Sequence, residues 1–127
     1  MANITITCTD NIKSRLDLWN ILKAIPASNY HNHETPLYWM DFGNTQTTGQ
    51  VVLGTIPKKI KQPASQLYET VGSLKVITRF VRYARVKEED SGPSCSLAEA
   101  LEKQDLFINS TLAQLGCNIL WKMSVME

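Results

Sequence analysis

The stretch "ITITCTDNIKSRLDLW", residues 4–19, decides the fold that this sequence predicts. Residues 3–8 alternate isoleucine with threonine and end at a cysteine, which is a β-branched run of strand length. Asp10 can cap a following helix, because its carboxylate can accept hydrogen bonds from the free amides of the first turn. A strand that runs directly into a helix is typical of parallel α/β proteins, in which ligands bind at this kind of junction.

Apolar residues recur at helical spacing beyond this junction. Ile12, Leu16, Trp19 and Leu22 stand at i, i+4, i+7 and i+10, which predicts a helix with one apolar face. Pro26 predicts the end of that helix, because proline has no backbone N–H to continue it.

Two more strands are predicted downstream of a polar loop at residues 27–35. A stretch rich in aromatic residues, 36–44, and a stretch bounded by glycines, 49–55, are separated by a short polar connection. Such a connection favours an antiparallel hairpin. Residues 57–73 contain prolines, a glycine and several lysines, and they predict a loop.

The last part of the chain is predicted to be mostly helical. Residues 75–89 have helical length, although their apolar residues could also suit a strand. Ser96 and Glu99 have the spacing of a capping box, and the last helix is predicted from Asp105 to about Met123. Its predicted buried stripe consists of Ile108, Leu112, Leu115 and Ile119, with Gly116 allowing close packing.

The order of these elements is strand, helix, strand, strand and then helix, which is typical of an α/β sheet rather than of a sandwich or a helix bundle. A chain of 127 residues has the length of one domain. We expect residues 1–56 to form a strand-helix-strand-strand unit. Residues 57–95 would be a basic linker and helix region, and residues 96–127 the C-terminal helices.

The composition argues against several classes of partner. A net charge of +1 offers no electrostatic basis for nucleic acid or a membrane as the main partner. No apolar run approaches the ~20 residues that a membrane helix needs, so we expect a cytoplasmic protein. The three cysteines are odd in number and have no regular spacing, so we expect no disulfide framework, and no C-x-x-C pair occurs that would predict a zinc site. Cys8 and Cys117 fall on apolar elements and are predicted to be core residues.

Several stretches together resemble one enzyme superfamily. "ITITCTDNIKSRLDLWNIL" resembles the strand and helix that carry the C-T-D-N motif of the ThiF/MoeB/ubiquitin-activating-enzyme superfamily. "DFGNTQTTGQVVLG" looks like the strand and Gly-Gln-Val that follow in that family, and "QDLFINSTLAQLGCNILWKM" looks like its long final helix. With "GPSCSLAEALEKQDLFINS", the chain is most similar to the ThiF-like proteins of the bacterial PRTRC gene system.

This resemblance implies an adenylyltransferase that binds ATP and Mg²⁺ and activates the C-terminal glycine of a ubiquitin-like or sulfur-carrier protein. It assigns Asp10 to the Mg²⁺ and phosphates, with Asn11 and Arg15 in support. A carboxylate suits this role because Mg²⁺ prefers oxygen ligands, and helix capping is the alternative role of Asp10. Cys95 is the candidate acyl acceptor by its position before the late helices. A helix N-terminus can lower the pKa of such a thiol, and an exposed, unreactive thiol is the alternative.

One departure from the family is large. No G-x-G-x-x-G occurs, so the glycine loop that lets backbone amides approach phosphate is missing. The chain therefore resembles the C-terminal half of a Rossmann-like ThiF domain. Its first strand would lie at an open sheet edge near Ile4–Cys8, which favours pairing with another chain, and we expect a homodimer. Two hypotheses follow: a portion of an adenylating enzyme, or a non-catalytic module for dimerisation or carrier docking.

Two further groups of residues are weaker candidates. His31 and His33 could hold a metal, but loop histidines without supporting ligands are usually only polar loop residues. Lys75, Arg79 and Arg82 would form a basic stripe if residues 75–87 are helical. A solvated helix face is the simpler interpretation, and nucleic-acid binding is not favoured.

Overall fold

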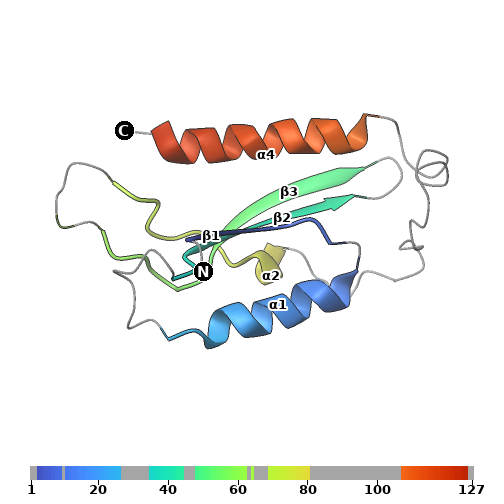
Figure 1. The fold of residues 1–127 in the computed structure, drawn as a ribbon. Coiled ribbons are helices and arrows are strands. Elements are labelled where there is room, and N and C mark those ends of the chain that lie inside the picture. The colour runs from blue at the N-terminus through green and yellow to red at the C-terminus, as the bar shows by residue number, and fades with distance from the viewer. Residues whose placement is uncertain are drawn as a thin grey trace.

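A computed structural model describes residues 3–9, 11–26, 35–44, 48–62, 64, 69–80 and 107–125. In chain order these contain β1 (Ile4–Thr7), α1 (Ile12–Ala24), β2 (Tyr38–Asn44), β3 (Gly49–Thr55), α2 (Ile77–Phe80) and α4 (Ile108–Val125). α1 lies on one face of the sheet and α4 lies on the opposite face (Figure 1). The predicted α/β class is confirmed as a mixed sheet flanked by helices.

The described sheet has the strand order β1-β2-β3, with the three strands that the sequence predicts. β1 runs parallel to β2, with Ile4 opposite Tyr38. β2 and β3 are antiparallel, and their register brings Asn44 opposite Gly49, as expected for a hairpin. β1 therefore lies at an edge of this sheet, as predicted.

The first helix differs from its prediction at two points. Its N-cap is Asn11 rather than Asp10, and the Asn11 side chain accepts a hydrogen bond of 2.7 Å from the backbone N–H of Ser14. Leu16 is exposed, whereas Arg15 and Leu22 are the buried residues of α1. Successive residues of a helix lie about 100° apart around its axis, so a helix that directs Arg15 into the sheet directs Leu16 toward solvent.

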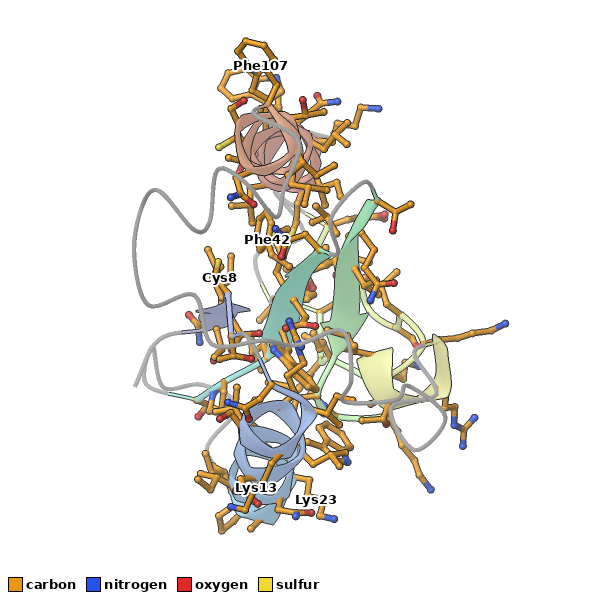
Figure 2. The ribbon with its side chains drawn as sticks, turned by 90° about the vertical axis from the view of Figure 1, so that its right-hand side faces the viewer. Cys8, Lys13, Lys23, Phe42 and Phe107 are labelled. Atoms are coloured by element: carbon orange, nitrogen blue, oxygen red, sulfur yellow. The ribbon has the colours of Figure 1, made fainter. Side chains whose placement is uncertain are left out.

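Alternate residues of β2 build the two layers of the core. Trp39 is buried toward α1, where its ring stacks on Trp19 with the centroids 6.1 Å apart. Phe42 lies on the other face, toward α4 (Figure 2). This alternation follows from the two-residue period of a strand, which sends successive side chains to opposite faces.

α4 packs over β2 and β3 through a narrower stripe than the sequence predicts. Leu112 and Gly116 are buried, but Leu115 is 51% exposed, so its assignment to the buried stripe is wrong. The predicted close packing at Gly116 is confirmed, because a Cβ at this position would run into the ring of Phe42. The helix axis can approach β2 closely only with a glycine at this point.

Two cysteines are placed differently from their prediction. Cys8 and Cys117 are both free and exposed, and neither is a core residue. Cys8 lies just beyond the end of the edge strand β1, on the same side of the sheet as α4 (Figure 2). Cys117 follows Gly116 on α4, and its position on the helix turns it away from the sheet.

The region after β3 has little regular structure. Residues 57–62, 64 and 69–73 contain neither helix nor strand, in agreement with the predicted loop. Of the stretch 75–89, the structure describes residues 75–80, where α2 confirms the helical alternative over its own four residues. The predicted capping box at Ser96 lies outside the described residues. No helix in the described ranges is long and apolar enough to cross a membrane.

Candidate functional site

The predicted ligand site is the junction between β1 and α1. Asp10, the residue that the family resemblance assigns to Mg²⁺, lies outside the described residues, as does Cys95. Asn11 is described, and its side-chain oxygen already accepts the Ser14 amide as the helix cap. The capping contact satisfies one of the unpaired amides of the first turn, so the Asn11 oxygen has a structural role.

Arg15 turns from α1 into the sheet instead of toward the junction. Its Nε lies 3.1 Å from Oδ1 and 3.0 Å from Oδ2 of Asp41, and its Nη2 donates a hydrogen bond of 2.9 Å to the carbonyl of Phe42. The side chains of Arg15 and Asp41 are only 10% and 1% exposed. The guanidinium of Arg15 is therefore bound in a buried ion pair with Asp41 and is not available to a phosphate.

Asp41 also belongs to a chain of hydrogen bonds that joins β1 to β2. The indole Nε1 of Trp39 donates to Thr7 Oγ1 over 2.8 Å, and the Thr7 hydroxyl donates to Asp41 Oδ1 over 2.6 Å. Sequence analysis missed Asp41, although a carboxylate between Met40 and Phe42 in an apolar strand was a signal that a buried partner had to exist.

A second ion pair, between Lys13 and Asp17 on the same helix, is exposed to solvent. Lys13 Nζ lies 2.6 Å from Asp17 Oδ2, with both side chains largely in solvent. The hydrogen bond and the negative charge of Asp17 raise the pKa of Lys13 above its usual value. Water and salt screen such a pair, so it contributes little compared with the buried pair of Arg15.

Thr9 is the other polar residue of interest at the junction. Its Oγ1 is buried and has no hydrogen-bond partner within the part of the chain that the structure describes. Because buried hydroxyl groups are nearly always paired, this oxygen stands out among the residues that follow β1. It lies beside the position of Asp10, but it does not by itself form a site.

The described residues do not provide the donor set of a metal site. They contain no group of three or more His, Cys, Asp or Glu side chains that could hold a metal ion. His31 and His33 lie outside this part of the chain. Lys75 precedes α2, so Lys75 and Arg79 do not share one helix as the predicted basic stripe requires, and Arg82 is not described.

The outer edge of β1 is the second candidate, as an interaction surface. Ile6 is 51% exposed, whereas its register partner Met40 is fully buried. α4 packs on β2 and β3, so it leaves the same face of β1 more open. β1 also lacks the charged residues and prolines that usually protect an edge strand.

The opposite edge of the sheet is partly covered. The hydroxyl of Thr55, at the end of β3, donates to the carbonyl of Leu74 and accepts from its N–H. A Cβ at Gly54 would approach the carbonyl of Lys75 to 2.7 Å, so the backbone of that segment lies directly against β3. The outer edge of β1 is therefore the exposed edge of the described sheet at which a partner strand could bind.

The chain matches no family model, no curated protein and no solved structure. The resemblance to ThiF-like proteins stays a prediction for this reason. Two features of the structure bear on function, namely the junction side chains that already have partners and the open edge of β1.

Proposed function

We propose that this chain is a non-catalytic interaction module that accepts a strand from a partner protein at the outer edge of β1. The observation that carries the proposal is the open edge: Ile6 is half exposed, and no described strand pairs with β1 on the side away from β2. Strand addition is a recurring mode of recognition, in which main-chain hydrogen bonds supply affinity and alternate side chains supply specificity.

The backbone direction supports this use of the edge. The carbonyl of Asn3 accepts a hydrogen bond of 2.9 Å from the N–H of Tyr38, so it points toward β2. Backbone groups alternate in direction along a strand, and the two threonines of β1 therefore also bond to β2. Ile4 and Ile6 direct their N–H and C=O groups outward, where a partner strand can pair with them.

The junction supports a non-catalytic role. The oxygen of Asn11 caps α1, and Arg15 is held by Asp41, so neither side chain is poised for the nucleotide role that the family resemblance implies. The exposed free thiols of Cys8 and Cys117 suit a reducing compartment, and we place the module in the cytoplasm on that basis.

A portion of an ATP-dependent adenylating enzyme is the second candidate. It is favoured by the buried hydroxyl of Thr9, which precedes Asp10 in the sequence and has no hydrogen-bond partner among the described residues. In this hypothesis the chain is the C-terminal half of a Rossmann-like ThiF domain, and another chain supplies the glycine loop. The substrate would then be a ubiquitin-like or sulfur-carrier protein, with Asp10 serving Mg²⁺ and ATP and Cys95 accepting the acyl group.

The proposed strand acceptor is tested with a capped peptide that carries residues 3–8 and a lysine tail for solubility. Amide exchange of the purified chain is followed by NMR as the peptide is added. We expect the amides of Ile4 and Ile6 to become protected by the peptide, or to be protected already by self-association. In contrast, the amides of Leu16 and Ile21 on α1 serve as internal references that the peptide leaves unchanged.

Ile6→Pro is the matched backbone variant. It removes an outward N–H and none of the hydrogen bonds to β2, so the fold should persist while peptide binding is lost. If the Ile4 and Ile6 amides exchange rapidly at millimolar peptide in the wild-type chain, the edge accepts no strand and the proposal fails.

A further inference from the structure

We propose that the strand accepted at this edge is β1 of a second copy of the chain, paired antiparallel about a two-fold axis so that two three-stranded sheets become one six-stranded sheet. The inference rests on the proposed strand-accepting function and names its partner. It follows from the side-chain pattern, the charge and the backbone direction of β1.

The side-chain pattern of β1 is self-complementary. Thr7 bonds to Asp41 on the α1 side of the sheet, so Thr5 shares that face, whereas Ile4 and Ile6 point to the α4 side. Residues directly opposite each other in an antiparallel pair have their side chains on the same face. Two copies of β1 therefore place apolar side chains opposite each other on one face and threonines opposite each other on the other.

Charge does not oppose the association of two copies. β1 contains no ionisable residue, so a two-fold axis brings no like charges together across the strands. The chain as a whole carries a net charge of only +1, and proteins close to neutrality associate more readily than highly charged ones. A two-fold interface uses the same patch twice, so self-complementarity is the property that it requires.

The direction of the backbone groups selects a register. In an antiparallel pair, two residues whose groups face each other exchange two hydrogen bonds. Placing the two-fold axis at Ile6 puts Ile6 opposite Ile6 of the second copy and Ile4 opposite Cys8 of the second copy. All of these residues have outward groups by alternation. A register centred on Thr5 leaves the outward groups of Cys8 without a partner in β1, so we assign the register centred on Ile6.

Pairing in this register also covers the apolar side of β1. Ile6 and Cys8 are exposed on the face that α4 leaves open, beside the buried Met40. In the paired sheet the isoleucines of both copies join in a single strip between the two α4 helices. The exposed apolar surface of each copy is thereby reduced, which favours association.

The association is tested by sedimentation equilibrium of the full chain. We expect a dimer in the wild type and a dissociation constant raised on the order of tenfold to a hundredfold by Ile6→Pro, because that variant removes an outward donor from each copy. Ile6→Lys should act in the same direction by placing two charges opposite each other. Ile21→Lys is the matched control, since Ile21 is an exposed isoleucine on α1, and it should leave the dimer intact.

The register is tested by cross-linking in a background that lacks the native cysteines. Ile6→Cys should form a disulfide-linked dimer on mild oxidation at least about tenfold faster than Thr5→Cys, because only position 6 meets itself at the axis, at a Cα separation of roughly 5.5 Å. Faster cross-linking through Thr5→Cys would replace the assigned register with the alternative one.

The possible outcomes separate the inference from the function on which it rests. A chain that stays monomeric at all concentrations but binds the strand peptide is a strand acceptor for another protein, which overturns the homodimer alone. A dimer that survives both Ile6→Pro and Ile6→Lys uses another surface and also overturns the inference. If the chain neither dimerises nor binds the peptide, both proposals are wrong.

Discussion

Arg15 carries its charge on the buried face of α1, and the carboxylate of Asp41 makes that position tolerable. Moving an ion out of water is costly unless the ion is paired and hydrogen-bonded, and here the guanidinium contacts both carboxylate oxygens and a backbone carbonyl. The family resemblance places Arg15 in support of a Mg²⁺–phosphate site, because the sequence shows the charge of this residue but not its partner 26 positions away.

Asp41→Ala is expected to lower the free energy of unfolding by about 3–5 kcal/mol, because it leaves the Arg15 charge buried without a partner. Lys13→Ala removes one partner of the exposed pair on the same helix and is expected to change stability little. Chemical denaturation followed by tryptophan fluorescence measures both, since Trp39 stacks on Trp19 beside the buried pair.

A second variant distinguishes the buried charge from a simple loss of packing. Arg15→Met combined with Asp41→Leu replaces the pair by apolar side chains and should recover much of the stability lost in Asp41→Ala. A double variant as unstable as Asp41→Ala would show that the unpaired charge is not the cause.

At the scale of the element, α4 illustrates how one glycine decides which face of a helix is buried. Hydrophobic spacing alone placed Leu115 in the buried stripe, but Gly116 lets the helix approach the ring of Phe42 and turns that stripe toward Leu112 and Gly116. The periodicity correctly predicted a long amphipathic helix, and its rotation about its own axis depended on a contact with β2.

Gly116→Ala is expected to destabilise the chain by about 1–2 kcal/mol. The new methyl group overlaps the Phe42 ring, and this cost exceeds the gain in helix propensity of about 1 kcal/mol that alanine brings. Thermal unfolding of Gly116→Ala is compared with that of Asn118→Ala, an exposed position on the same helix.

Relief of the overlap provides the complementary test. Phe42→Leu added to Gly116→Ala should restore part of the lost stability, because the smaller side chain leaves room for the methyl group. If Gly116→Ala were as stable as the wild type or more so, the close contact between α4 and β2 would be absent in solution.

At the scale of the whole molecule, the three-stranded sheet lacks the parts that a nucleotide site of the ThiF type needs. β1 is the edge of the described sheet, and no glycine-rich phosphate loop occurs in the sequence. An edge without charge or proline is suited to pairing, which agrees with the proposed strand-accepting role.

Titration calorimetry with Mg·ATP distinguishes the two proposed functions, which are a non-catalytic interaction module and one half of an adenylating enzyme. We expect the chain alone to bind no Mg·ATP, because Asn11 and Arg15 are committed to the cap and to Asp41. Asp10→Ala is the control for any heat that is observed. Saturable binding that Asp10→Ala abolishes would contradict the non-catalytic proposal and favour adenylation of a carrier protein.

The sequence by itself determined the α/β class, the three strands, the hairpin, and the helices that follow β1 and end the chain. These features depend on local periodicity, on turn residues and on glycine and proline positions, all of which lie within short stretches.

Only the tertiary structure decided which side chains meet. The pairing of Arg15 with Asp41, the exposure of Leu16 and Leu115, and the surface position of Cys117 depend on how each helix is rotated against the sheet. The exposure of Cys8 depends instead on its place at the end of the edge strand β1. That rotation is set by contacts between residues far apart in the chain, such as Gly116 with Phe42, which local spacing does not contain. For the same reason the sequence predicted candidate ligand residues, whereas the structure shows that Asn11 caps α1 and that Arg15 pairs with Asp41.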